Sequence, residues 1–290
     1  MAKAHGAVTG VRRTGRAHLR ERLPQRRGDP SRRRAAVPAE VTLLDGKVAL
    51  VAGASRGIGA AVAAALASAG AAVAVAARTE TAGRVPGTIH DVAESITASG
   101  GAALAVACDI TDEQSVASAF DATIGEFGGV DIVVANAGVL WLGPVESTPL
   151  KRWQLCLDVN LTGTFLVTKA AIPHLRAQGG GSLIAVTTSG VGMIDRGANA
   201  YWVSKAAVER LYLGLAHDLR DDDVAVNCLS PARVVLTEGW QAAGGGQEMP
   251  PEMVEAPETM GRAATILAAQ RADGITGTIQ RSEDLLATLR

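Results

Sequence analysis

Cysteine is scarce in this sequence, and the few thiols that occur form no recognisable pattern. Three of the 290 residues are cysteine, namely Cys108, Cys156 and Cys228. The number is odd, no CxxC pair occurs, and each cysteine lies in or beside an apolar run. This usage argues against a disulfide framework and predicts reduced, mostly buried thiols.

Histidine is also sparse, and its distribution argues against a metal centre. None of the five histidines has ligand spacing to another; they are His5, His18, His90, His174 and His217. We therefore predict that the protein binds no metal.

Long apolar runs are missing as well. No uninterrupted apolar run reaches the roughly 18 residues that a membrane-spanning helix needs, and the N-terminus lacks the apolar core of a secretory signal. We expect a soluble, cytoplasmic protein. With 48% hydrophobic and 20% charged residues, a chain of this length can bury one large α/β core, and length alone permits one domain or two.

The formal net charge of −1 conceals two regions of opposite charge. Residues 1–40 contain ten Arg and one Lys against three acidic residues, a net charge of +8, and the other 250 residues carry −9. Residues 1–40 lack apolar periodicity, so we interpret them as a disordered extension. Three explanations compete: an arm that binds nucleic acid or a membrane surface, a transit peptide, or translated sequence upstream of the true start. We favour the last, with a cellular chain beginning near Val41 and a folded domain spanning 41–290.

A glycine-rich turn separates an apolar run, residues 48–52, from a helical pattern of small residues, 60–69. Its glycines are Gly53, Gly57 and Gly59. In such a turn the first glycine lets the chain leave a strand, the second lets the backbone approach a diphosphate, and the third lets the helix pack on the sheet. N–H groups of the first helical turn would then face the phosphates. The spacing is GxxxGxG rather than GxGxxG, and its context predicts a nucleotide-binding loop.

Strands and helices alternate along the rest of the chain. The predicted strands are 48–52, 73–77, 104–107, 132–135, 182–186, 224–229 and 275–279. The predicted helices are 60–69, 92–98, 112–127, 150–176, 201–219 and a short terminal helix or tail at 281–290. This alternation predicts a single-domain α/β fold, a doubly wound and mostly parallel seven-stranded Rossmann sheet with helices on both faces.

Basic side chains stand where a site for NAD usually has an acid. Ala77 and Arg78 end the second predicted strand, a position at which a carboxylate commonly binds the ribose 2′-hydroxyl. Arg78 and Arg56 could flank a 2′-phosphate, which favours NADP(H) and leaves NAD(H) possible. The alternative is that both are solvated surface arginines. Asp109, at the carboxyl end of the third strand, is placed to meet an adenine amino group.

Tyr201 and Lys205 are four residues apart at the head of a predicted helix. At this spacing both side chains project from one helical face, one turn apart. An ammonium group beside a phenol favours the phenolate, so we expect Lys205 to lower the pKa of Tyr201 toward the range that a general acid/base needs. The position of the pair after the fifth strand strengthens this interpretation.

Together these motifs resemble the short-chain dehydrogenase/reductase family, in its single-domain branch. They are the GxxxGxG turn, Asp109, Asn136-Ala137-Gly138, Asn160, the hydroxyls after the fifth strand, Tyr201-xxx-Lys205 and Asn227-xxx-Pro231. The motifs follow the family's order from residue 41 to about 279. The resemblance implies hydride transfer between a nicotinamide and a carbonyl or alcohol carbon.

The resemblance also implies roles for individual residues. Tyr201 would give a proton to the developing alkoxide, Lys205 would bind the nicotinamide ribose, and Asn160 would hold a water of the proton relay. The implied cofactor-binding residues are Gly53, Ser55, Arg56, Gly57, Ile58, Gly59, Arg78, Asp109, Ile110, Asn136, Ala137, Gly138, Tyr201, Lys205, Pro231 and Thr237. Homodimers or homotetramers formed through the two long helices are a further expectation.

The sequence departs from the family pattern at the hydroxyl that would polarise the substrate carbonyl. Ungapped counting from Tyr201 leads to Thr188, whereas Ser189 has the usual residue type and a following glycine. Neighbours on a strand point to opposite faces, so one of the two can serve; both stay candidates, and spacing favours Thr188. Smaller departures are Ala52, Ala135 and Ala232, the last of which stands where Gly usually follows Pro.

The segment 238–258 is rich in Gly, Pro and Met, which predicts a mobile cover over the substrate pocket. We expect an apolar lining, with plain core packing as the alternative, from Trp141, Leu142, Trp202, Trp240 and Met253. The sequence thus predicts an NADP(H)-dependent oxidoreductase acting on a small apolar ketone, aldehyde or alcohol. One alternative is a cofactor-binding sensor or scaffold with little activity. Another is nucleic-acid binding, but the acidic 250 residues would repel phosphates, so we predict neither nucleic-acid nor membrane partners.

Overall fold

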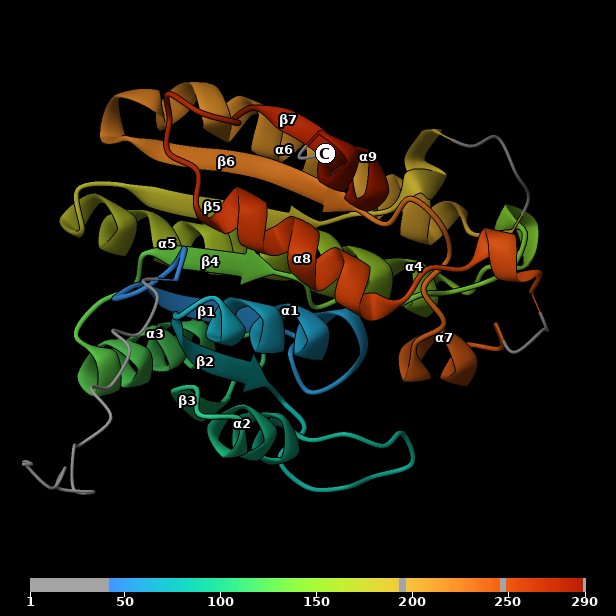
Figure 1. Ribbon diagram of the computed structural model, residues 1–290. Helices are drawn as coiled ribbons and strands as arrows, with labels where there is room; N and C mark the ends of the chain where they lie inside the picture. The colour runs from blue at the N-terminus through green and yellow to red at the C-terminus, as the bar shows by residue number, and fades with distance from the viewer. Residues whose placement is uncertain (1–41, 193–196, 246–248, 289–290) are drawn as a thin grey trace, which may run out of the picture. The chain divides into compact units, whose positions relative to one another are not determined.

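Seven parallel strands form one sheet within residues 41–290 (Figure 1). They are β1 (Val48–Ala52), β2 (Ala72–Ala77), β3 (Ala103–Ala107), β4 (Ile132–Ala135), β5 (Gly181–Val186), β6 (Val224–Ser230) and β7 (Thr278–Arg281). Their order is β3-β2-β1-β4-β5-β6-β7, which confirms the predicted doubly wound topology. This computed structural model describes residues 42–192, 197–245 and 249–288. The extension predicted for 1–40, and residues 246–248 of the predicted cover, lie outside the described residues.

The central strands are short apolar runs that are buried on both faces. Every residue of β1 is buried, as expected where helices cover both sides of a parallel sheet. Ala49 and Val51 face one core, and Leu50 and Ala52 face the other, because successive side chains of a strand point to opposite faces. The sheet therefore separates two hydrophobic cores.

Helices cover both of these faces. They are α1 (Gly57–Ser68), α2 (Ile89–Ala98), α3 (Glu113–Phe127), α4 (Leu150–Cys156), α5 (Thr164–Ala177), α6 (Asn199–Asp218), α7 (Glu238–Ala242), α8 (Pro257–Ala268) and α9 (Ser282–Ala287). Buried residues of α1, α2 and α8 join one core, and those of α3, α5 and α6 join the other. In Figure 1, α1 and α8 lie side by side in front of the sheet.

The long helix predicted for 150–176 contains a wider segment. Between α4 and α5 the backbone forms a π-helix, η2 (Leu157–Gly163), a rare arrangement that is frequent at functional sites. By length and composition the run Leu150–Ala177 is apolar enough to cross a membrane, with a mean hydropathy of 1.3. Its Val167, Ala171 and Leu175 are buried in the core on the sheet, so this run is a layer of the fold.

The last strand begins later than the predicted 275–279. Side chains replace the sheet bonds just before it: Asn227 Nδ2 donates to the Ile275 carbonyl at 2.7 Å, and Val226 N donates to Thr276 Oγ1 at 3.0 Å. Gly277 then adopts a positive φ of 68°, which breaks the extended backbone. Regular pairing with β6 therefore starts at Thr278.

Candidate active site

A cavity of about 560 Å³ opens at the carboxyl ends of the strands, where doubly wound sheets bind ligands. The turns after β1 to β5, the first turn of α6 and the loop after β6 all contribute to its wall. The predicted site residues that line it are Gly53, Ser55, Arg56, Gly57, Ile58, Arg78, Asp109, Ile110, Asn136, Ala137, Gly138, Thr188, Ser189, Tyr201, Lys205, Pro231 and Thr237. The remaining two, Gly59 and Asn160, are buried behind this wall.

The turn after β1 requires glycine. Gly53 and Gly57 have positive φ values of 79° and 56°, which residues with side chains rarely adopt. A Cβ atom at Gly59 would overlap the Gly53 carbonyl oxygen and would lie 2.5 Å from Asn136 Nδ2. Asn136 Nδ2 also donates to that carbonyl at 2.8 Å. The turn after β1 is therefore packed directly against the end of β4.

The N-terminus of α1 borders the cavity through Gly57 and Ile58 and has no side-chain cap. Thr88 caps α2 and Asp112 caps α3, whereas no side chain within the described residues caps α1. Its first turn also contains no acidic residue. A diphosphate fits this end of the helix, because unpaired N–H groups and the positive end of the helix dipole favour an anion.

The Arg56 guanidinium is bound by backbone carbonyls of the loop before α2. Its Nε donates to Pro86 O at 2.8 Å, and one terminal nitrogen donates to Gly87 O at 2.8 Å and to Val85 O at 3.3 Å. Arg56 thus holds this loop against the glycine turn while still lining the cavity. The other terminal nitrogen makes none of these bonds.

Arg78 and Asp109 form an ion pair at the ends of β2 and β3, with NH1 and Oδ2 3.7 Å apart. Asp109 Oδ1 accepts hydrogen bonds from the Thr111 backbone N at 3.0 Å and from its hydroxyl at 2.7 Å. Burial raises the pKa of Asp109, but the Thr111 bonds and the Arg78 charge outweigh it, so the pKa lies below its usual value. Asp109 is therefore an ionised acceptor at neutral pH.

The phenol of Tyr201 lies against Thr188 in the wall of the cavity. The Thr188 hydroxyl acts to lower the pKa of this phenol, so Thr188 is a candidate for the hydroxyl that works beside it. Ser189 also lines the cavity and begins a short 3₁₀ turn, Ser189–Gly192. Burial raises the pKa of Tyr201 to about 12, and Thr188 offsets this only in part.

Lys205 lies deeper, with 3% of its surface exposed and its Nζ donating to Val186 O at 2.7 Å. Burial lowers the pKa of Lys205 to about 8, and the nearby Glu209 acts in the opposite direction. Nζ is 6.0 Å from the centre of the Tyr201 ring. The expected lowering of the Tyr201 pKa is therefore wrong for this structure, because burial disfavours the charged forms of both groups.

Asn160 joins three parts of the site. Its Oδ1 accepts from Val139 N at 2.7 Å, and its Nδ2 donates to Val139 O at 2.9 Å and to Ser204 Oγ at 2.9 Å. Ser204 Oγ in turn donates to the Tyr201 carbonyl at 2.6 Å. A Cβ atom at Gly138 would be 3.3 Å from Asn160 Oδ1 and 3.5 Å from Lys205 Nζ. The π-helical segment thus connects the loop after β4 to the first turn of α6.

Sequence reasoning missed two buried residues of α6, Ser204 and Glu209. Ser204 is fully buried and stands between the tyrosine and the lysine in the motif, a position that could have drawn notice. Glu209 follows Lys205 by one helical turn. Burial raises the pKa of Glu209, while Thr187 and Lys205 lower it, so the lysine and this acid share one buried environment.

One of the five residues predicted to form an apolar lining, Trp240, borders the cavity. The other four are not among the described residues that border it. Trp202 packs against Gly190, where an added Cβ would meet the indole, and Trp141 lies under the Arg152 guanidinium at 4.8 Å. Apolar side chains that do line the cavity include Val139, Leu140, Val159, Val234 and Val235.

The three cysteines are free and buried, which confirms that prediction. In the part of the chain that the structure describes, no group of three or more His, Cys, Asp or Glu side chains is gathered.

The similarity to known proteins decides the family. The family model described as short chain dehydrogenase matches residues 47–247. The chain belongs to the short-chain dehydrogenase/reductase family. Members of this family are NAD(P)-dependent oxidoreductases that act on CH–OH groups.

Curated relatives carry dehydrogenase names. Hydroxysteroid dehydrogenase-like protein 2 of Bos taurus is 35% identical over 205 residues, which cover 70% of this chain and 49% of that protein. D-threitol dehydrogenase of Mycolicibacterium smegmatis is 36% identical over 241 residues, which cover 81% of this chain and 90% of that protein. The chain thus spans about half the length of the hydroxysteroid dehydrogenase-like relative.

Solved structures share the fold, and two of them contain different cofactors, NADP in one and NADH in the other. A putative NAD(P)-dependent gluconate 5-dehydrogenase from Beutenbergia cavernae, with bound NADP, has a TM-score of 0.74 and 30% identity over 84% of this chain and 98% of that chain. A 7α-hydroxysteroid dehydrogenase with NADH and 7-oxo glycochenodeoxycholic acid has a TM-score of 0.72 and 28% identity over 83% of this chain and 94% of that chain. The short-chain dehydrogenase described here therefore has the fold of an NAD(P)-binding protein.

Proposed function

We propose that this short-chain dehydrogenase interconverts a ketone or aldehyde and an alcohol with NADP(H), using Tyr201 as the general acid and base. The observation that carries the proposal is that Tyr201 and Thr188 lie together in the wall of the cavity that begins at the glycine turn. A substrate oxygen beside these two hydroxyls would accept hydrogen bonds from both. Such bonds stabilise the negative charge that develops on the oxygen during reduction.

The protonation states favour proton donation. NADP(H) would supply the hydride, and the side chains would supply binding and proton handling. With a pKa raised to about 12, Tyr201 keeps its proton at neutral pH, which suits the reduction direction. Lys205, with a pKa of about 8, is mostly charged there and lies behind the phenol as a proton reservoir and as a donor toward ribose hydroxyls. Asn160 fixes the loop after β4 against α6 and so keeps these groups in place.

The preference for NADP(H) rests on charge. The residue directly after β2 is Arg78 rather than an acid, and its side chain is 60% exposed. Arg78 and the terminal nitrogen of Arg56 that is free of the carbonyls described above supply positive charge for a 2′-phosphate. Asp109 would accept from the adenine amino group and compete with the phosphate for Arg78.

The apolar wall near Tyr201 supports a small apolar carbonyl or alcohol substrate. We extend the proposal to a cytoplasmic homodimer or homotetramer formed through α5 and α6. Phe165 on α5 and Val203 on α6 are each 46% exposed, which leaves apolar surface for a second copy of the chain.

The two tyrosines of this chain offer a matched test. We expect Tyr201→Phe to lower kcat by about 100-fold or more across a panel of ketones, aldehydes and alcohols, with little change in the Kd for NADPH. Tyr212→Phe is the control, because Tyr212 lies on the same helix, is buried, and bonds Thr168 instead of lining the cavity. Undiminished turnover in Tyr201→Phe would contradict the mechanism, tighter binding of NADH would contradict the cofactor preference, and NADPH binding without any turnover would favour a sensor or scaffold.

A further inference from the structure

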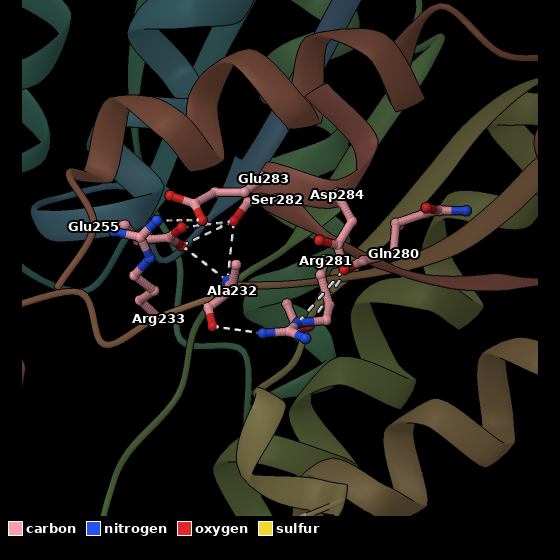
Figure 2. A network of polar contacts seen from close by, with 9 residues as sticks. Ala232, Arg233, Glu255, Gln280, Arg281, Ser282, Glu283 and Asp284 are labelled. Carbon is pink, nitrogen blue, oxygen red and sulfur yellow. Dashed lines mark hydrogen bonds and ion pairs between the residues drawn. The ribbon is translucent and has the colours of Figure 1, made fainter. Parts of the chain in front are cut away.

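The backbone of Ala232, just after β6 and Pro231, is held by side chains from distant parts of the chain (Figure 2). Its N–H donates to Ser282 Oγ at 3.0 Å and to Glu255 Oε1 at 3.2 Å. Its carbonyl accepts from an Arg281 terminal nitrogen at 2.8 Å. Both polar groups of this residue are thus satisfied by side chains rather than by a neighbouring strand.

Glu255 and Ser282 form the buried centre of this arrangement. Glu255 is 5% exposed and Ser282 is fully buried. The Ser282 hydroxyl lies 2.9 Å from Oε1 and 2.8 Å from Oε2 of the Glu255 carboxylate, so it can donate to either oxygen while accepting from Ala232 N. Figure 2 shows the serine, the carboxylate and the Ala232 backbone joined to one another by dashed lines.

A short parallel bridge keeps Glu255 in register with this loop. Val234 pairs with Val254: the Val234 N donates to Met253 O at 2.9 Å, and the Glu255 N donates to Val234 O at 3.0 Å. Glu255 therefore contacts the loop through its backbone at residue 234 and through its side chain at residue 232. Such two-point attachment fixes the loop more rigidly than either bond alone.

Charged neighbours surround the buried pair. Arg233 donates to Glu283 at 2.9 Å, and Arg281 faces Asp284 at 3.8 Å. Burial raises the pKa of Glu255; Ser282, the Ala232 N–H and Arg233 act against this rise, and Glu283 adds to it. Removing these donors would leave the buried Glu255 carboxylate without hydrogen-bond partners, which is energetically unfavourable.

The segment held in this way forms one wall of the cavity. Pro231, Arg233, Val234, Val235 and Thr237 all line it, as do Tyr201 and the glycine turn. A Cβ atom added at Gly57 would lie 2.9 Å from Thr237 Cγ2, so the end of this loop touches the diphosphate-binding turn. Movement of the loop would therefore alter the cofactor-binding surface directly.

We propose that Glu255 and Ser282 are positioning residues for cofactor binding, because they fix the backbone of residues 231–237 against the cavity. The inference rests on the proposed NADP(H) site. It concerns the affinity for the cofactor and assigns neither residue a part in the chemical step.

The test compares two serines that are both fully buried and bonded through their hydroxyls. Ser282→Ala removes the hydrogen bond to Ala232 N. Ser182→Ala is the control: Ser182 lies in β5, its hydroxyl donates to Leu267 O at 2.8 Å, and it does not line the cavity. We expect Ser282→Ala to raise the Kd for NADPH about tenfold, with kcat at saturating NADPH within about twofold of wild type. Ser182→Ala should lower the melting temperature without changing that Kd.

Glu255 provides a second, independent arm. Glu255→Gln keeps an acceptor for Ala232 N–H and a partner for Ser282, so its Kd for NADPH should stay within about threefold of wild type, whereas Glu255→Ala should match Ser282→Ala. Wild-type affinity in Ser282→Ala, or an equal loss in Ser182→Ala, would overturn the proposal. NADPH binding by the wild-type protein and the turnover of Tyr201→Phe test the proposed function. The Kd values of the Ser282 and Glu255 variants test the positioning role, so one proposal can fail while the other holds.

Discussion

Replacing Lys205 with methionine should stabilise the protein near neutral pH while it abolishes turnover. The ammonium group is almost fully buried, and its one described hydrogen bond goes to Val186 O at 2.7 Å. Charge in such a place is unfavourable unless it is paired. Methionine fills a similar volume without the charge, so the folding energy that Lys205 costs should be recovered in the variant.

The pKa of Lys205 sets the size of the effect. A fall from 10.5 to about 8 corresponds to about 3 kcal/mol, at about 1.4 kcal/mol for each unit. The variant also leaves the Val186 carbonyl without its donor, which costs about 1–2 kcal/mol. The net gain in the free energy of unfolding should therefore be about 1–2 kcal/mol.

The pH dependence has a definite sign. Between a pH of about 8 and 10.5 the folded protein binds fewer protons at Lys205 than the unfolded chain, so its stability rises with pH. The cost of burying the charge is complete below this window and disappears above it. The difference in stability between Lys205→Met and wild type should thus change by about 3 kcal/mol as the pH is raised through the window, from a gain below it to a loss above it.

Urea denaturation at the two ends of this window, followed by circular dichroism, measures the difference. Lys169→Met is the control, because Lys169 is 57% exposed and pairs with Glu113 on the surface. We expect no comparable pH-dependent difference for it. If Lys205→Met and Lys169→Met differ from wild type by the same amount at both pH values, Lys205 is not desolvated and the reasoning is refuted.

Four further outcomes are expected. Thr188→Val should lower kcat about 100-fold and Ser189→Ala less than about threefold in a steady-state assay, because Thr188 lies beside the phenol that we propose as the general acid. The reverse order would assign the carbonyl-polarising role to Ser189. Arg78→Asp should weaken NADPH relative to NADH by about tenfold or more in fluorescence titrations, by placing like charge near a 2′-phosphate. Gly59→Ala should destabilise the protein by about 1–3 kcal/mol and impair cofactor binding, since its Cβ overlaps the preceding turn. Tyr212→Phe should cost about 1–2 kcal/mol in urea denaturation, because its partner hydroxyl on α5 loses a hydrogen bond, and should leave turnover unchanged.

Much of the fold could be predicted because local patterns and packing agree. The strands 48–52 and 132–135 are short apolar runs with turns at both ends, and they match β1 and β4 residue for residue. The glycine turn was readable for the same reason, since a positive φ or a crowded Cβ position leaves few other residues possible there. Spacing likewise favoured Thr188 over Ser189; both line the cavity, and the choice between them stays a prediction.

What the sequence could not predict depends on contacts between distant residues. Arg56 bonds carbonyls about 30 residues away, and Glu255 bonds a serine 27 residues away, and neither partner carries a local signature. The predicted start of β7 at residue 275 was wrong because the side chains of Asn227, in β6, and of Thr276 form hydrogen bonds in place of backbone bonds between the two strands. The predicted lowering of the Tyr201 pKa was wrong because burial, a property of the whole fold, raises that pKa.

The bonds of Arg56 to the carbonyls of Val85, Pro86 and Gly87 have a practical consequence for protein engineering. Exchanging Arg56 to switch coenzymes would also release an entire surface loop, so any loss of affinity would mix two causes. Among the described contacts, Arg78 holds no loop in this way, since its side chain pairs with the carboxylate of Asp109. A redesign of coenzyme choice in this scaffold should begin at position 78 and leave position 56 intact.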